Sequence, residues 1–187
     1  MTGSRRRQGV SEGVYVALLR AVNVGGTGKL AMSDLKAICH AAGFLHIETY
    51  IASGNVVFQA NMRAGDVKRA LEERLQRHAG KPVSVAIRTA DELAAIVEAN
   101  PFKTEPPNKT VTIFLDQAPA DDALMHARGR QREALHLGAR EIYVHYVDGI
   151  GRSKLTIPAA RSATARNMNT VARLATLAAR KRAALRG

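Results

Sequence analysis

The first half of the chain alternates short apolar runs with two helical stripes, and this order constrains the fold more than any other feature. Residues 14–19 form an apolar run with β-branched and aromatic members, which predicts a strand buried on both faces. Apolar residues three and four apart predict helices over residues 33–43 and 66–79. Three more strands are predicted at residues 47–51, 56–58 and 83–87. The resulting βαββαβ order is typical of the ferredoxin-like arrangement.

The second half predicts a smaller α/β part. Thr89 and Glu92 form a capping-box pattern that opens a third helix, and Asn100-Pro101 ends it. Further predicted elements are strands at 111–115 and 142–147 and helices at 120–136 and 167–182. We therefore expect an α+β fold with a disordered basic tail at 1–12, a ferredoxin-like lobe at 13–88, and a second lobe at 89–187 that carries a basic C-terminal helix.

Local signals set the expected helix ends. Ser33 is a good N-cap residue for the first helix, because its hydroxyl can accept from the free amides of the first turn. Gly43 and Gly80 follow the first and second helical stripes, which is where a left-handed glycine commonly ends a helix.

The positive charge is concentrated at the C-terminal end. The formal net charge is +12, and residues 149–187 carry nine Lys and Arg residues and no Asp or Glu. Such asymmetry indicates contact with an anionic partner, most simply nucleic acid. The alternative is that these cations are only solvated.

The composition indicates a cytoplasmic protein without a membrane span. Cys39 is the single cysteine, so no intrachain disulfide can form and a reducing compartment is expected. It lies on the apolar face of its predicted helix, where a buried, inert thiol is expected. No apolar run approaches the roughly 18 residues of a membrane-spanning helix. The six histidines lack metal-ligand spacing, so neither a metal nor a cofactor is expected.

A glycine-rich loop follows the first predicted strand. Gly25, Gly26 and Lys29 lie in it, and the amides of such a loop can surround a phosphate. The Walker A pattern fails because Asn23 replaces its first glycine. Three alternatives stay open: a flexible connection, a general anion contact and a dinucleotide site.

The last predicted helix has two distinct faces. Arg166, Arg173 and Arg180 are seven residues apart and form a basic stripe, while Val171 and Leu174 belong to the opposite apolar face. The stripe is a candidate for contacting nucleic-acid phosphates. The alternative is a helix docked by its apolar face with arginines that are merely exposed.

Four motifs in fixed order carry a family resemblance; they lie at residues 15–26, 50–58, 100–102, and 149–155 followed by 164–170. Through them the chain resembles bacterial members of the family of domain of unknown function 1697, over residues 14–177. The resemblance implies an α+β fold with a ferredoxin-like part and no established activity. The family typically has Trp where this chain has Met168, and about one more helical turn between Leu155 and Thr164.

The polar residues of these motifs are the candidate site. They are rich in Arg, Lys, Asn and Ser and lack carboxylates, a mixture that suits anion binding better than acid–base catalysis. With the glycine loop, the candidate ligand-binding residues are Arg20, Asn23, Gly25, Gly26, Lys29, Ser53, Asn55, Arg152, Ser153, Lys154, Arg166, Asn167 and Asn169. A purely structural role for this set, in capping turns and satisfying carbonyls, is the alternative.

The resulting functional hypothesis is a non-enzymatic binding protein for a phosphate-bearing ligand, with nucleic acid as the favoured class. An enzyme acting on a small phosphorylated or nucleotide substrate is the alternative, and a partner-binding role of the C-terminal helix is a third. No catalytic residue is identified from the sequence, and the oligomeric state is left open.

Overall fold

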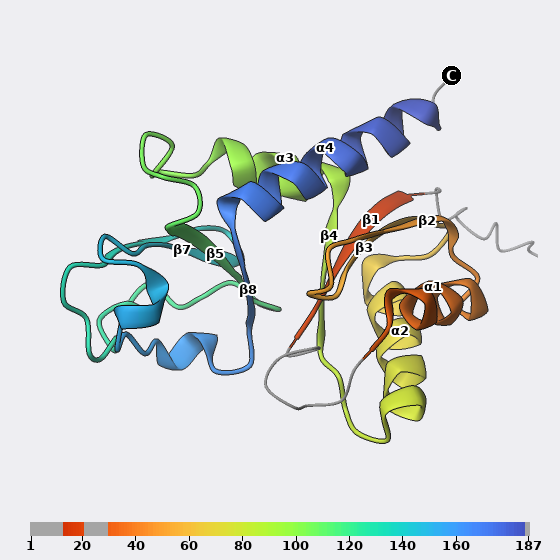
Figure 1. Ribbon diagram of the computed structural model, residues 1–187, viewed down its shortest axis with the longest axis horizontal. Helices are drawn as coiled ribbons and strands as arrows, with labels where there is room; N and C mark the ends of the chain where they lie inside the picture. The colour runs from red at the N-terminus through yellow and green to blue at the C-terminus, as the bar shows by residue number, and fades with distance from the viewer. Residues whose placement is uncertain (1–12, 21–29, 186–187) are drawn as a thin grey trace, which may run out of the picture.

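Two antiparallel four-stranded sheets organise the chain in the computed structural model, which describes residues 13–20 and 30–185 (Figure 1). The first sheet has the order β2-β3-β1-β4 and the second the order β6-β7-β5-β8. The strands are β1 (Gly13–Leu19), β2 (Leu45–Tyr50), β3 (Asn55–Ala60), β4 (Val85–Thr89), β5 (Thr110–Phe114), β6 (Ala134–Leu137), β7 (Glu141–His145) and β8 (Thr164–Asn167). The helices are α1 (Met32–Ala41), α2 (Ala64–Ala79), α3 (Ala90–Glu98) and α4 (Met168–Ala184), with 3₁₀ turns at Ile150–Arg152 and Pro158–Ala160.

Strand β1 lies inside the first sheet and is buried on both faces, as its sequence predicts. Tyr15, Ala17 and Leu19 belong to the core under α1 and α2. The alternate residues Val14, Val16 and Leu18 belong to a second core under α3 and α4. Because successive side chains of a strand point to opposite faces, β1 contributes to both cores. The predicted βαββαβ element order and the packing of the first two helices on one core are both observed.

Helix α4 joins the two sheets. Its buried residues Val171, Leu174 and Ala178 pack in one apolar cluster with residues of β1 and with Phe114 and Tyr143 of the second sheet. Figure 1 shows α3 and α4 lying together across the top of both sheets. The C-terminal helix, predicted at 167–182, is thus confirmed, and its apolar face holds the two sheets to one core.

The predicted helix at 120–136 is wrong. Residues 121–126 form turns, and residues 134–137 form strand β6. Gly129 has a left-handed φ of +67°, and a Cβ at this position would lie 2.3 Å from the Lys154 carbonyl oxygen. A close approach of two chain segments therefore replaces the helix. Strand β8 was also not predicted; its four residues have no apolar alternation.

Local signals predicted the helix ends unevenly. The capping box is present: the Thr89 hydroxyl accepts from the Glu92 amide at 3.1 Å, and the Glu92 carboxylate accepts from the Thr89 amide at 2.8 Å. Gly43 and Gly80 follow their helices with left-handed φ values of 81° and 67°. The N-cap prediction at Ser33 is wrong, because α1 already begins at Met32 and Ala31 precedes it without a side-chain cap.

Replacing Thr89 with alanine should destabilise the fold by about 1 kcal/mol, since one amide of the first turn of α3 loses its acceptor. Chemical denaturation of the two proteins measures this difference. Thr176→Ala is the matched control, because the exposed Thr176 hydroxyl only donates to the Ala172 carbonyl oxygen within α4. A Thr89 variant that unfolds like the control would contradict the capping role.

This chain departs from the family pattern at Met168 and in the short segment between Leu155 and Thr164, and each contributes a buried side chain. Met168 is buried, and the Thr112 hydroxyl donates to its sulfur at 3.0 Å. In the short segment before β8, Thr156 pairs with Arg128 and Ile157 is buried. Met168 therefore anchors the start of α4.

Candidate anion-binding site

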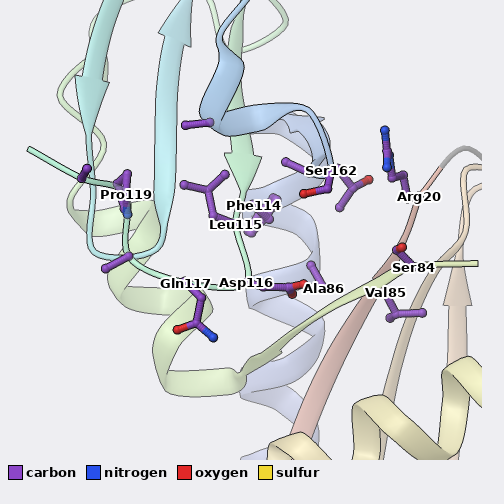
Figure 2. A pocket seen from close by; sticks show the side chains of 15 residues that line it. Arg20, Ser84, Val85, Ala86, Phe114, Leu115, Asp116, Gln117, Pro119 and Ser162 are labelled. Atoms are coloured by element: carbon purple, nitrogen blue, oxygen red, sulfur yellow. The ribbon is translucent and has the colours of Figure 1, made fainter. Parts of the chain in front are cut away.

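A pocket of about 290 Å³ lies between the two sheets (Figure 2). It is bounded by the start of β4, the chain that leaves β5, the segment before β8, and Arg20 at the end of β1. In Figure 2, Arg20 lies on the same side as Ser84 and Ser162, while Gln117 and Pro119 lie across the pocket. The lining residues are Arg20, Ser84, Val85, Ala86, Phe114, Leu115, Asp116, Gln117, Ala118, Pro119, Ala120, Ala159, Ser162, Ala163 and Thr164.

Arg20 is the cation of this pocket. Its amide donates to the Ser84 carbonyl at 2.9 Å, which fixes the backbone at the pocket wall. One guanidinium nitrogen donates to the Arg161 carbonyl at 2.5 Å, while the side chain stays exposed. A guanidinium has five N–H donors, so the remaining ones can meet an anion in the pocket.

The acid of the pocket, Asp116, already has a cationic partner. Lys68 of α2 donates to its carboxylate at 2.6 Å and lies 3.5 Å from Glu72. Within residues 13–20 and 30–185, Arg20 is paired with a neutral carbonyl and not with a carboxylate. Among the described lining residues, Asp116 thus has a cationic partner and Arg20 has no acidic one, so the Arg20 guanidinium is the charged group that can meet an anionic occupant.

Arg166 and Asn55, two candidates from the sequence, meet each other outside this pocket lining. The Arg166 Nε donates to the Asn55 Oδ1 at 2.6 Å, and one terminal nitrogen donates to the Ser53 carbonyl at 2.9 Å and the Leu19 carbonyl at 2.8 Å. The other terminal nitrogen donates to the Thr164 hydroxyl and the Ala165 carbonyl, both at 2.8 Å. Every guanidinium nitrogen is engaged within the protein, so Arg166 ties β8 to the end of β1 and to the β2–β3 turn.

Asn55 organises the turn that Arg166 holds. It is fully buried, and its amide nitrogen donates to the Tyr50 carbonyl at 3.0 Å and the Ser53 hydroxyl at 2.8 Å. Ile51 in this turn has a left-handed φ of 49°, which is strained for a β-branched residue. Burial lowers the pKa of Arg166 to about 10, a consequence of desolvation around its charge. Arg166, Asn55 and Ser53 therefore form a structural hydrogen-bond cluster.

The candidates of the fourth motif lie elsewhere. Arg152 and Ser153 line a second pocket of about 210 Å³ beside Tyr146 and Asp148. The Ser153 hydroxyl donates to the Glu133 carboxylate and accepts from the Leu155 amide at 3.1 Å. The hydrogen bonds from the Ser153 hydroxyl and the Gln131 amide hold the pKa of Glu133 below its ordinary value. Lys154 is exposed.

The basic stripe predicted on the last helix is not intact. Arg166 lies in β8, before α4 begins, and Arg180 donates to the Glu48 carboxylate at 2.8 Å. Arg173 is exposed on α4. Asn167 caps α4, because its Oδ1 accepts from the Thr170 amide at 3.0 Å, and Asn169 is exposed.

Comparison with models of known protein families shows which family the chain belongs to. A family model described as protein of unknown function (DUF1697) matches residues 13–143, which is more than half of the chain. The chain belongs to the DUF1697 family. The match includes the first three motifs and ends before the two segments of the fourth, so it is shorter than the resemblance read from the sequence.

A solved structure supports the fold of this DUF1697 protein. The conserved bacterial protein SP0830 from Streptococcus pneumoniae is similar, with a TM-score of 0.75 and 22% sequence identity, and the match covers 90% of this chain and 99% of that chain. At this identity the likeness concerns the fold alone. A search of curated proteins finds no match.

Several site predictions fall outside the part of the chain that the structure describes. Asn23, Gly25, Gly26 and Lys29 of the glycine loop belong to this group, as does the predicted tail at 1–12. Of the residues that line the pocket, sequence reasoning identified Arg20 but missed Ser84, Ser162 and residues 114–120. They come from separate segments without a motif, and only the packing of two sheets brings them together.

The described ranges of this DUF1697 protein contain one cysteine, and its thiol is buried. Cys39 is buried, as predicted, and burial raises the pKa of its thiol to about 12, so it stays protonated at neutral pH. Residues 13–20 and 30–185 contain no cluster of His, Cys, Asp and Glu suited to a metal ion. No helix in these ranges has the length and apolar character to span a membrane.

Proposed function

We propose that this DUF1697 protein is a non-enzymatic binding protein for a small phosphate-bearing ligand, held in the pocket between the two sheets. The observation that carries the proposal is the guanidinium of Arg20, which pairs with no carboxylate of the described residues and lines the pocket together with Ser84 and Ser162. A guanidinium supplies charge-assisted hydrogen bonds to phosphate oxygens, and hydroxyls complete such a site.

Binding is favoured over catalysis by the chemistry of the lining. A catalytic site would need a group that accepts or donates protons. Among the described lining residues only Arg20 and Asp116 carry charge, and Lys68 already binds the Asp116 carboxylate. The proposal extends to a ferredoxin-like class for the first sheet, supported by its βαββαβ element order, and to a reducing, cytoplasmic location, supported by the buried free thiol of Cys39.

A thermal-shift screen followed by calorimetry tests this proposal. The probes are inorganic phosphate, ribose 5-phosphate and the nucleoside monophosphates, with ribose and adenosine as uncharged counterparts. We expect at least one phosphate-bearing probe to stabilise the protein and its uncharged counterpart to have no effect. Phosphorus NMR after incubation should recover the ligand unchanged; turnover would support the enzyme alternative instead.

Replacing Arg20 with glutamine should weaken binding of that probe about 10- to 100-fold, since a hydrogen bond to a charged group contributes about 1.5–3 kcal/mol. The melting temperature without ligand should barely change, because the side chain is exposed. Arg77→Gln is the matched control: it removes the same charge from an exposed position outside the pocket. Equal losses in both variants, or no phosphate-bearing ligand at all, would overturn the pocket proposal.

A further inference from the structure

Five cationic side chains lie on two neighbouring segments beside the second sheet, and we call them the basic ribbon: Arg128, Arg130, Arg132, Arg152 and Lys154. The two segments are joined by a backbone bridge, in which the Arg128 and Thr156 amides each donate to the other's carbonyl at 2.8 Å. Gly129 lies against the Lys154 carbonyl so closely that a Cβ would reach it at 2.3 Å. Arg132 and Arg152 line the same small pocket.

The ribbon presents excess positive charge. All five side chains belong to exposed residues. Arg132 pairs with Asp148 at 3.0 Å, and the Arg130 Nε donates to the neutral Glu133 carbonyl at 2.9 Å. Within residues 13–20 and 30–185, no carboxylate pairs with Arg128, Arg152 or Lys154.

Glu133, which directly follows Arg132 in the sequence, is turned inward. Glu133 is only 7% exposed, and its carboxylate accepts from the Ser153 hydroxyl and the Gln131 amide. These bonds occupy both carboxylate oxygens, so Glu133 braces the two segments, and Arg130 is the ribbon cation whose charge it meets. Arg128, Arg152 and Lys154 are thus held on a braced backbone and pair with no carboxylate of the described residues.

The C-terminal helix differs from the ribbon in this respect. Arg180 and Lys181 both pair with Glu48, at 2.8 and 3.1 Å, and Arg182 pairs with Asp91. Two acids, Glu48 of the first sheet and Asp91 of α3, therefore compensate two of these three charges at the end of α4. The ribbon, where Arg132 alone has an ion pair among the described residues, therefore carries more uncompensated charge than the end of α4.

We propose that the basic ribbon binds the phosphate backbone of nucleic acid without sequence preference. Four of its five cations are arginines, whose planar guanidinium suits bidentate contact with phosphate oxygens. The neighbouring aromatic residue Tyr146 is 8% exposed, so base stacking contributes nothing here. Exposed Met125 and Ile150, at 84% and 58%, flank the ribbon in sequence and add apolar contact. Residues 121–126 form turns, whereas membrane-surface binding usually employs an amphipathic helix.

Fluorescence anisotropy with labelled single-stranded RNA and duplex DNA, over a salt series, tests the ribbon. With three uncompensated cations, the slope of log affinity against log salt should be about −2 for single strands and about −3 for duplex. The triple variant Arg128→Gln, Arg152→Gln, Lys154→Gln should lose at least tenfold in affinity at low salt and flatten the slope by two to three contacts. Random sequences of equal length should bind equally.

The control removes three charges elsewhere: Arg63→Gln, Arg77→Gln and Arg173→Gln, all exposed residues outside the ribbon. Circular dichroism and melting curves verify that both triple variants fold. Equal loss in the two variants would reduce the effect to net charge, and tighter binding to phosphatidylserine vesicles than to nucleic acid would assign the surface to membranes; either result overturns the proposal. Arg20→Gln should bind nucleic acid like the wild type, which separates this test from that of the pocket.

Discussion

Replacing Arg88 with alanine is expected to destabilise the protein by about 3–5 kcal/mol, because it leaves three carbonyls without their donor and opens a cavity. Arg88 is 2% exposed, although it carries a guanidinium. It donates to the carbonyls of Ile87 at 2.9 Å, Leu115 at 2.8 Å and Arg140 at 2.7 Å. Its guanidinium carbon lies 5.5 Å from the centre of the Phe114 ring. Arg88 therefore links β4 of the first sheet to chain segments of the second.

Equilibrium unfolding in urea measures the loss, and for a chain of this length it corresponds to about 2–4 °C in melting temperature per kcal/mol. The control is Arg140→Gln, which removes a partly exposed guanidinium that pairs with Glu92 and keeps the backbone carbonyl that accepts from Arg88. Such a pair contributes at most about 1 kcal/mol. An Arg88 variant no less stable than the Arg140 variant would show that the buried hydrogen bonds do not hold the sheets together.

The position of Arg88 explains why arginine occupies it. Burial and the neighbouring positive charge of Arg140 lower the pKa of Arg88, so both effects disfavour its charged form. A lysine ammonium would deprotonate more readily under the same influences, and its single nitrogen cannot reach three separated carbonyls in one plane. The fork geometry of the guanidinium is what spans the junction.

The first half of the fold was predictable because its signals are local. The apolar run of β1, the two helical stripes, the capping box at Thr89 and the left-handed Gly80 are each determined by residues a few positions apart. The second half depends on distant pairings. Gly129 approaches Lys154, and β8 pairs with β5 more than fifty positions earlier, at Arg166 opposite Thr112. No periodicity within either segment records these contacts, so residues 120–136 were wrongly predicted as a helix.

In the candidate site, too, local sequence identifies the polar residues, whereas contacts between distant segments determine their roles. Arg20 and Asn55 were recognisable as polar residues at strand ends, but their roles differ only because of their neighbours. Asn55 is buried and meets Arg166, 111 positions later in the chain. Arg20 stays exposed and meets a pocket whose hydroxyls come from Ser84 and Ser162. The ribbon arginines at 128–132 are inconspicuous in the sequence, because residues 13–148 contain almost as many acids as cations and only the fold shows which of them pair.

Replacing Arg166 with alanine should cost about 2–4 kcal/mol of folding stability. The side chain donates to the Asn55 amide oxygen and to the Leu19 and Ser53 carbonyls, and hydrogen bonds to a charged donor contribute about 1.5–3 kcal/mol before losses at the orphaned acceptors are added. Arg173→Ala is the control on an exposed position of α4, where about 0.5 kcal/mol or less is expected. Urea unfolding of both variants gives the comparison.

A double-mutant cycle with Asn55→Ala identifies the contact itself. Because Arg166 and Asn55 share one hydrogen-bond cluster, their combined loss should fall short of the sum of the single losses by about 1–3 kcal/mol. The same cycle with Thr89→Ala, whose capping box includes neither residue, should be additive within about 0.5 kcal/mol. If Arg166→Ala lowers the free energy of unfolding by less than about 1 kcal/mol and shows no coupling to Asn55, the hydrogen bonds of the guanidinium do not stabilise the fold. It would then return to the set of side chains that can meet an anionic ligand, beside Arg20.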